Sequence, residues 1–253
     1  MNITLLLLTH NSSEDITNNF KWLDKCKIIN EIIAIDDFSI DKTLQSLKKL
    51  ESNSRRVEIF QHALSNNFSS QRTYGLKKAT NNWILWLDPD EAPSRELITF
   101  IKKFNHPQYE NYAFKREDIF IGHKLNWGET GNVHFTRLFN KNFGKFEHPV
   151  HEIWSSNKDI HTFDLVIDHS SHKTLSSFFT KINLYSTIRA NELKEQGTKS
   201  GLFSIIIYPT AKFIQNYFFR FGFLDSTAGI IFALGMSFHS FLVRAKLWHL
   251  SQQ

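Results

Sequence analysis

The stretch WILWLDPDE, residues 83–91, decides how this chain folds and where its chemistry lies. Its first five residues are apolar without interruption, which is typical of a strand covered on both faces in a parallel sheet. Three carboxylic acids follow within four residues, at the point where the strand ends. Because ligands of open α/β sheets bind beyond the carboxyl ends of the strands, the acids are predicted to line a binding crevice.

Three apolar runs that precede this stretch indicate three more strands, at residues 3–8, 31–37 and 57–60. Helical patterns lie between them, after Ser12 and Ser13, after Asp41, and over residues 69–80. This alternation predicts right-handed βαβ crossovers and a mainly parallel sheet. Polar clusters at residues 9–11, 36–41 and 88–91 all follow strand ends, so we expect them to converge on one crevice.

The second half of the chain has a different pattern. A helix capped by Ser94 is followed by strand-like segments at residues 111–117, 134–141 and 163–169, which indicate a mixed or antiparallel extension of the sheet. A long helical pattern then covers residues 175–193. We expect this half to recognise an acceptor.

Composition and missing motifs narrow the class of protein. A chain of 253 residues accommodates one α/β domain with a small appendage. Its single cysteine, Cys26, excludes an internal disulfide and a cysteine-based zinc cluster, and suits a reducing cytoplasm. Neither a G-x-G-x-x-G motif nor a P-loop motif is present, which argues against dinucleotide binding and P-loop chemistry. The net charge of +5 suits a polyanion such as nucleic acid, a nucleotide or an acidic membrane.

The acids of residues 88–91 are suitable ligands for Mg²⁺ or Mn²⁺, which commonly bridge one or two carboxylates to substrate phosphates. Such an ion would neutralise charge on a leaving diphosphate. The alternative is a solvated acidic turn in front of the helix that Ser94 caps. The motif is short, and the apolar strand in front of it, together with the acids Asp36 and Asp37, favours the functional interpretation.

Residues 3–91 resemble the family-two glycosyltransferases, which have a GT-A type fold. The resemblance is carried by LLLLTHNSSE, IAIDDFSIDKT and NNFSSQRTYGLKKATNNWILWLDPDE, in this order. It implies an α/β GT-A catalytic domain over residues 1–173, with a nucleotide-binding half (1–91) and an acceptor half (92–173). The central sheet is expected to be mainly parallel, but mixed, and flanked by helices.

The resemblance also implies roles for individual residues. Thr9, Asp37 and Arg72 would hold the uracil end of a UDP-sugar, while Asp88 would hold the ribose or sugar. Asp90 would bind the metal. The residues expected to bind the nucleotide-sugar are Thr9, Asn11, Asp36, Asp37, Arg72 and Asp88.

Two departures from the family pattern leave the donor sugar open. Phe38 stands where many relatives have glycine, and Gln71-Arg72-Thr73 replaces the more usual Ala-Arg-Asn, so the arginine is kept.

The segment RLFNKNFGKFEHPVHEIW, residues 137–154, resembles a narrower subgroup that includes lipopolysaccharide core glucosyltransferases. An inverting transfer needs a base that takes a proton from the acceptor hydroxyl. We predict Glu152 for this role, with His151 or His148 as an alternative or an orienting neighbour, and Arg137 as a phosphate contact. A surface loop carboxylate is the alternative for Glu152.

The sequence IDHSSH, residues 167–172, contains two further candidates. His169 is predicted as an additional metal ligand, and a structural histidine is the alternative for both His169 and His172.

Residues 174–253 are predicted to form amphipathic or apolar helices that associate with a membrane. The stretch Ser226–Val243 has eighteen residues without formal charge, which reaches the threshold for a candidate span, although polar residues dilute it. Arg220, Arg244 and Lys246 flank it, a pattern that favours helices lying in the headgroup region of an anionic leaflet. Aromatic core helices or a dimer interface are the alternative.

The leading hypothesis is an inverting glycosyltransferase that moves a hexose from a UDP-sugar, with UDP-glucose as the expected donor, to a lipid-linked acceptor such as lipopolysaccharide inner core. It would use Mg²⁺ or Mn²⁺ at the inner face of the cytoplasmic membrane. A nucleotidyltransferase acting on sugar phosphates is the second enzyme hypothesis. A basic nucleic-acid-binding protein is the third, but the aromatic residues stand in apolar runs rather than among lysines and arginines, so we expect no nucleic-acid partner.

Overall fold

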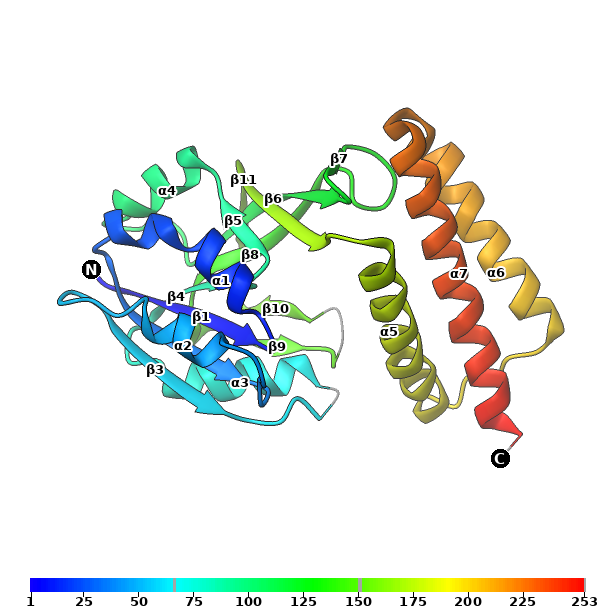
Figure 1. The fold of residues 1–253 in the computed structure, drawn as a ribbon, viewed down its shortest axis with the longest axis horizontal. Coiled ribbons are helices and arrows are strands. Elements are labelled where there is room, and N and C mark those ends of the chain that lie inside the picture. The colour runs from blue at the N-terminus through cyan, green and yellow to red at the C-terminus, as the bar shows by residue number, and fades with distance from the viewer. Residues whose placement is uncertain (66, 150–151, 253) are drawn as a thin grey trace. The chain divides into compact units, whose positions relative to one another are not determined.

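The computed structural model describes residues 1–65, 67–149 and 152–252. The chain divides into two compact units. The first comprises Met1–Arg116 and His134–His169, and the second comprises Glu117–Val133 and Ser170–Gln253. Figure 1 shows the two units, with strands dominating the first and long helices the second.

A nine-stranded sheet runs through the described residues, in the order β3-β2-β1-β4-β8-β6-β11-β5, with β7 paired to β6. Its strands β1 to β4 pair in parallel, and β8 joins β4 antiparallel, so the sheet is mixed as expected. A separate two-stranded sheet pairs β9 with β10. The strands are β1 (Ile3–Thr9), β2 (Ile29–Asp36), β3 (Arg56–Gln61), β4 (Trp83–Leu87), β5 (Glu91–Pro93), β6 (Asn111–Phe120), β7 (His123–Leu125), β8 (Val133–Asn140), β9 (Gly144–Glu147), β10 (Ile153–Ser156) and β11 (Ile160–His172).

Helices cover both faces of the sheet in the first unit. They are α1 (Ser13–Asn19), the 3₁₀ turn η1 (Lys21–Lys25), α2 (Thr43–Lys48), α3 (Phe68–Lys78) and α4 (Arg95–Lys102). Alternate strand residues supply two separate cores: Leu5 and Leu7 pack with side chains of α1, α2 and α4, whereas Leu6 packs on the opposite face with Ile33 and Trp86. This burial of both faces explains why the strand sequences are continuously apolar.

Helix α3 lies unusually close to the sheet. A Cβ atom added to Gly75 would lie 2.4 Å from Cδ1 of Leu6 and 3.1 Å from Cγ1 of Ile35. Glycine is therefore needed here for packing, and the close approach carries Arg72, one turn earlier on α3, down to the sheet.

The four early strands and the Ser94-capped helix confirm the sequence-based prediction of the α/β fold. Four short strands were not predicted: β5, β7, β9 and β10. The omission of β5 matters most, because residue Glu91 was expected in an acidic turn. It begins a strand that pairs with β11, and its side chain is fully buried.

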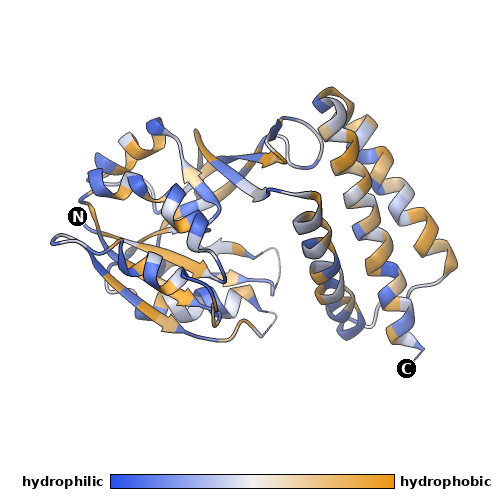
Figure 2. Ribbon diagram, in the orientation of Figure 1, coloured by the Kyte–Doolittle hydropathy of each residue, from blue (hydrophilic) through white to orange (hydrophobic). Residues whose placement is uncertain are grey.

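The second unit contains α5 (Leu175–Glu195), α6 (Leu202–Ile214), a π-helical turn η3 (Gln215–Phe219), a 3₁₀ turn η4 (Gly222–Asp225) and α7 (Ser226–Ser251). Helix α7 packs closely on α5, since Phe178 and Phe232 stack at 5.7 Å and a Cβ on Gly235 would lie 2.2 Å from Phe178. Among the described residues, one helical stretch, Gly222–Ser251, is long and apolar enough to cross a membrane. Figure 2 shows how strongly apolar residues dominate α6 and much of α7. The predicted domain boundary after residue 173 stays a prediction.

Candidate functional site

The loops that follow β1 and β2 are fastened to each other. The Thr9 hydroxyl donates to Oδ1 of Asp36 at 2.9 Å, and the Asp37 amide donates to the Thr9 carbonyl at 2.8 Å. The Asn11 side chain accepts the Ile40 amide at 2.9 Å. Thr9 and Asp36 are buried, so they hold the loops in shape, whereas Asn11 and Asp37 remain accessible to a ligand.

The acidic stretch after β4 joins the same end of the sheet. Strand β4 pairs with β1 up to Leu7 and Leu87, and the side-chain amide of Asn19 in α1 donates to the Pro89 carbonyl at 2.9 Å. The three polar clusters predicted to converge are thereby connected at the carboxyl ends of the strands.

Phe38 has a left-handed backbone conformation, with φ of 50°, and its side chain is 54% exposed. This conformation costs a non-glycine residue about 1 kcal/mol. It explains why glycine suits this position in many relatives.

Two acids of the acidic stretch belong to an ionic cluster in which Arg72, Arg137 and Glu91 are buried and Asp88 and Glu152 are partly exposed. Nη2 of Arg72 donates to Oδ1 of Asp88 at 2.8 Å, and its Nε donates to Oε1 of Glu152 at 2.6 Å. Nη2 of Arg137 lies 3.6 Å from Oδ2 of Asp88 and donates to Oε1 of Glu91. One guanidinium therefore connects Asp88 to Glu152, and the other connects Asp88 to Glu91.

Trp86 supports both guanidinium groups of the ionic cluster. The Cζ atoms of Arg72 and Arg137 lie 3.9 and 4.1 Å from the centre of its ring, within the range of a cation–π interaction. Planar stacking of this kind favours arginine over lysine, because only the guanidinium combines a flat face with a fork of donors. The apolar strand β4 thus supplies the platform and, two residues later, the carboxylate.

The electrostatics of the ionic cluster distinguish Asp88 from Glu91. Burial alone would raise the pKa of Asp88, but the charges of Arg72 and Arg137 outweigh burial and hold that pKa well below its usual range. Burial raises the pKa of Glu91. The two guanidiniums therefore favour the ionised form of Asp88, and each of its two oxygens faces one of them.

The pair formed by Glu91 and Arg137 was not predicted from the sequence. Arg137 was predicted as a phosphate contact, but its side chain is 3% exposed and is directed to Glu91. The guanidinium of Arg72 contacts Asp88 and Glu152. That Arg72 holds the uracil end of a UDP-sugar together with Thr9 and Asp37 stays a prediction. The residues of the ionic cluster lie on α3, β5 and β8 and next to β4 and β10. They meet only through tertiary contacts, which short-range sequence patterns do not contain.

Asp90 and His169 form a second group of side chains. Nε2 of His169 lies 3.6 Å from Oδ1 of Asp90, and the side chains are 14% and 19% exposed. His169 reaches this place because β11 pairs with β5, opposite Glu91. In the ranges that the structure describes, no three histidine, cysteine or acidic residues are grouped as a complete metal site.

This pair nevertheless fits a divalent ion that a substrate would complete. Mg²⁺ and related ions commonly keep one or two protein ligands and take the remaining oxygens from phosphates and water. Asp90 and His169 supply an oxygen and a nitrogen of suitable type for Mn²⁺ or Mg²⁺.

The remaining histidine predictions have different outcomes. His151 lies outside the described residues. The carbonyl of His148 accepts the Ser69 hydroxyl from α3. His172 belongs to the second unit, where its ring lies 4.8 Å from that of Phe178.

Comparison with known proteins identifies the class. Residues 4–163 match the family described as "Glycosyl transferase family 2", and the chain belongs to this family. It is 26% identical to an uncharacterised glycosyltransferase of Rickettsia prowazekii, over 98% of this chain and 87% of the relative. It is 21% identical to the lipopolysaccharide core biosynthesis glycosyltransferase LpsC of Rhizobium meliloti, over 89% of this chain and 84% of that protein.

The fold comparison agrees with this assignment. A mannosyltransferase from Pyrobaculum calidifontis, solved in complex with GDP-Man and Mn²⁺, superposes with a TM-score of 0.57 at 12% identity, over 98% of this chain and 87% of the other. The protein is a glycosyltransferase with a GT-A fold.

Proposed function

We propose that the protein is a metal-dependent, inverting hexosyltransferase that uses a UDP-sugar and a lipid-linked saccharide acceptor. One observation carries the proposal. Arg72 holds Glu152 and Asp88 on one guanidinium, and two residues beyond Asp88 the side chain of Asp90 lies beside His169. A candidate base and a candidate metal site therefore lie on two groups of side chains that the short segment Asp88–Asp90 joins.

The proposed division of labour follows from accessibility and contacts. Asp90 and His169 would hold the ion, which supplies positive charge to the diphosphate as it leaves. Asp37 and Asn11 remain accessible for the nucleotide, and Thr9 and Asp36 keep their loops in place. Asp88 positions Arg72, whose second contact orients Glu152.

Glu152 is the proposed general base. Its carboxylate would take the proton of the acceptor hydroxyl while that oxygen bonds to the anomeric carbon and the bond from this carbon to the diphosphate oxygen breaks. The products are the glycoside, protonated Glu152 and the nucleoside diphosphate. Arg72 fixes one oxygen of Glu152 at 2.6 Å, and such fixation keeps the carboxylate oriented before the acceptor binds.

UDP is the proposed nucleotide because of the resemblance of residues 3–91 to family members that use it. The mannosyltransferase of similar fold was solved with GDP-Man, so GDP-mannose is the competing donor. For the acceptor, the similarity to LpsC favours lipopolysaccharide inner core.

The proposed location is the inner face of the cytoplasmic membrane. Residues 197–253 carry five lysines and arginines and one carboxylate, a composition suited to an anionic leaflet. In this proposal the catalytic domain ends near residue 173, and residues 174–253 bring it to the membrane that holds the acceptor.

A panel of nucleotide-sugars tests the proposal. Purified protein is incubated with UDP-glucose, other UDP-hexoses and GDP-mannose, with Mn²⁺ or Mg²⁺, in the presence and absence of bacterial lipid extract. We expect release of UDP that requires the ion and increases with the lipid extract. Release of pyrophosphate from a nucleoside triphosphate and a sugar phosphate would instead indicate a nucleotidyltransferase.

Two substitutions separate the proposed roles. Glu152→Gln should leave donor binding intact and slow transfer by about a hundredfold or more, which is the range for a lost general base. Asp90→Asn should remove the dependence of donor binding on the ion. Glu51→Gln, at an exposed position of the same unit, is the matched carboxylate control and should change neither. Unchanged turnover of Glu152→Gln would contradict the assignment of the base.

A further inference from the structure

Two segments of the second unit that are distant in sequence are fastened together at one point. The carboxylate of Asp225 accepts the amides of Asn126 and Trp127 at 3.0 and 2.9 Å. The Gly128 amide donates to the carbonyl of Arg220 at 2.9 Å. The loop between β7 and β8 and the turn between α6 and α7 therefore form one fixed piece.

A polar group beside this piece strengthens the attachment. Glu129 accepts Nδ2 of Asn216 at 3.1 Å and pairs with Lys212 of α6. The contacts bind both ends of the loop at residues 126–129 to η3 and η4, so that the turn is held from two directions.

The turn itself has an unfavourable backbone. Phe221 has φ of 56°, in the left-handed region where a bulky residue is uncommon. A Cβ on Gly222 would lie 2.6 Å from the carbonyl oxygen of Asn216, and one on Gly229 would lie 2.0 Å from that of Gly222. A strained aromatic residue persists only where its surroundings determine the conformation, and such strain often marks a functional element.

The fixed piece displays apolar side chains to solvent rather than burying them. Phe219 is 76% exposed, and five neighbours are also exposed although each is large and apolar. We call this group the aromatic edge; its members are Trp127, Phe218, Phe219, Phe221, Phe223 and Leu224. Adjacent helix α6 has no buried side chain. The ring centres of Trp127 and Phe221 lie 5.8 Å apart and those of Phe221 and Phe223 lie 6.2 Å apart, and exposed apolar side chains that gather in this way mark a site of interaction.

The charges around the aromatic edge select among possible partners. Arg220 lies on the turn and Arg244 stacks on Tyr208 of α6 at 3.8 Å, whereas Lys212 of α6 is paired with Glu129. The two carboxylates of the fixed piece, Glu129 and Asp225, are both occupied within it. A second copy of this surface would bring cations against cations. An anionic lipid surface complements both the charge and the exposed rings.

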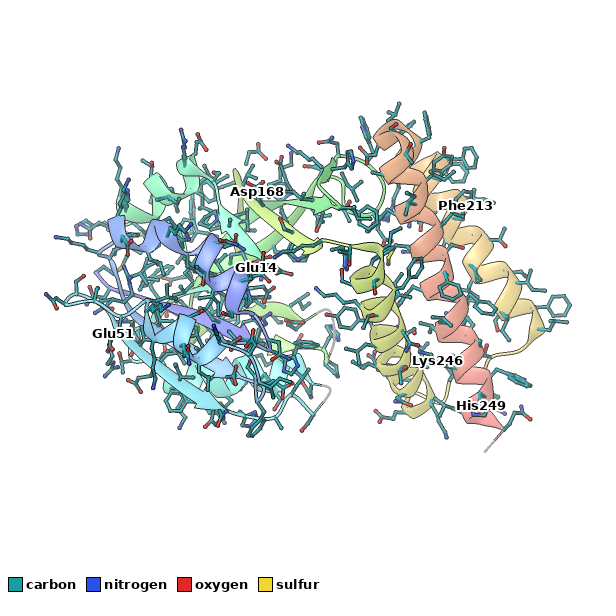
Figure 3. All side chains as sticks on the ribbon, in the orientation of Figure 1. Glu14, Glu51, Asp168, Phe213, Lys246 and His249 are labelled. Atoms are coloured by element: carbon teal, nitrogen blue, oxygen red, sulfur yellow. The ribbon has the colours of Figure 1, made fainter. Side chains whose placement is uncertain are left out.

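Helix α7 is apolar enough to cross a membrane, but its contacts argue against insertion. Nζ of Lys246, labelled in Figure 3, donates to Asn183, Ser186 and Thr187 of α5 at 2.7–2.8 Å. Helix α5 carries Lys181, Arg189, Glu192, Lys194 and Glu195. Crossing the hydrocarbon would require α7 to leave α5 or to take these charges with it, and both are costly.

We propose that the aromatic edge is the element that enters the headgroup region of an anionic membrane, with α6 lying along the surface and α7 remaining on α5. This inference rests on the membrane association within the proposed function and specifies where it occurs. Because Trp127 comes from the acceptor half of the chain, the edge attaches the β7–β8 loop to the same lipid surface.

Vesicle partitioning of the full-length protein tests the inference. We use vesicles of phosphatidylcholine with and without phosphatidylglycerol, and compare wild type with Phe221→Asn, with the pair Phe219→Ser and Phe221→Asn, and with Trp127→Ser. Asparagine tolerates the left-handed conformation, so Phe221→Asn should keep or raise the thermal stability. We expect the pair to weaken partitioning into anionic vesicles by at least about tenfold, since two large apolar side chains no longer leave water.

The control is Leu184→Ser, which removes an exposed apolar side chain from α5 of the same unit and should leave partitioning unchanged. Equal partitioning of wild type and the pair would overturn the inference, including the case in which the pair changes only the dimerisation of the protein. Wild type that binds neither vesicle would overturn the inference and the membrane part of the proposed function together. Failure of nucleotide-sugar turnover, with the partitioning loss as expected, would overturn only the proposed reaction.

Discussion

Replacing Arg72 provides a quantitative test of the ionic cluster. Its three carboxylates and two guanidiniums carry a formal charge of −1, and Arg72 is almost fully buried. Arg72→Met raises the uncompensated charge to −2 and deprives Glu152 of its guanidinium partner. Breaking a buried pair in this way costs about 3–5 kcal/mol of the free energy of unfolding.

Glu152→Gln has a milder effect on the same cluster. It brings the formal charge to zero, and the amide oxygen can still accept from Nε of Arg72. The expected cost is about 1–2 kcal/mol, because an ion pair becomes a hydrogen bond between the guanidinium and a neutral amide. In the double variant, however, glutamine replaces a Glu152 carboxylate that Arg72→Met has already deprived of its guanidinium partner. The double variant should therefore lose about 1–3 kcal/mol less unfolding free energy than the sum of the two single losses.

Urea unfolding of the four proteins measures this coupling. Near-ultraviolet circular dichroism follows the packed aromatic residues, including Trp86, which contacts both arginines. Because the chain has two compact units, the free energies are taken from the unfolding transition of the first unit, which contains the ionic cluster. Costs that add to within about 0.5 kcal/mol would refute the inference that one guanidinium serves both carboxylates.

An exposed ion pair provides the matched control. Lys145 and Glu147 lie 2.9 Å apart on β9, with side chains that are 74% and 36% exposed. Lys145→Met and Glu147→Gln should be nearly additive, since water and salt screen exposed charges.

Three further predictions follow from individual contacts. Asp90→Asn should weaken binding of Mn²⁺ in the presence of UDP by about tenfold or more while leaving the thermal transition unchanged, as measured by calorimetry; equal affinity would remove Asp90 from the proposed metal site. Burial alone would raise the pKa of Glu31, but hydrogen bonds from Thr4 and Thr80 and the contact with Arg56 outweigh it and lower that pKa below its ordinary value of 4.5. The stabilisation by Glu31 is therefore complete above a pH of about 4.5 and is lost as the pH falls through the lowered pKa of the folded protein. Glu31→Gln should cost about 2 kcal/mol of unfolding free energy at pH near 7 and progressively less in acid, as measured by urea titrations at several pH values. A cost independent of pH would contradict this. Gly75→Ala should lower stability by about 1–3 kcal/mol, because the new methyl group would overlap Leu6; a stabilised variant would show that α3 can move away.

The first half of the fold was predictable because its signals are local. The run Trp83–Leu87 was predicted with the boundaries that β4 has, since uninterrupted apolar residues identify a strand buried on both faces. Ser94 was predicted as a cap and its side chain accepts the Leu97 amide. Each of these signals depends on residues within one helix turn or one strand.

The arrangement of the candidate site depended on pairing that local signals do not contain. Strand β5 is three residues long and contains a proline, so its own sequence does not favour a strand. Its pairing with β11 buries Glu91 and places His169 beside Asp90. Likewise, Arg72 and Glu152 meet across 80 positions of the chain, and only the resemblance to a family indicated that both belong to one site.

The ionic cluster also has a consequence for the order in which the chain folds. Its five charges come from α3, β5, β8 and the segments flanking β4 and β10, and they become mutually compensated only when all of these elements are in place. Closing such long loops carries an entropic cost that local helices and hairpins avoid, so the cluster should assemble after the rate-limiting barrier of folding. Substitutions within it would then accelerate unfolding and leave the refolding rate nearly unchanged, and the completed site would mark the last step by which the chain becomes native.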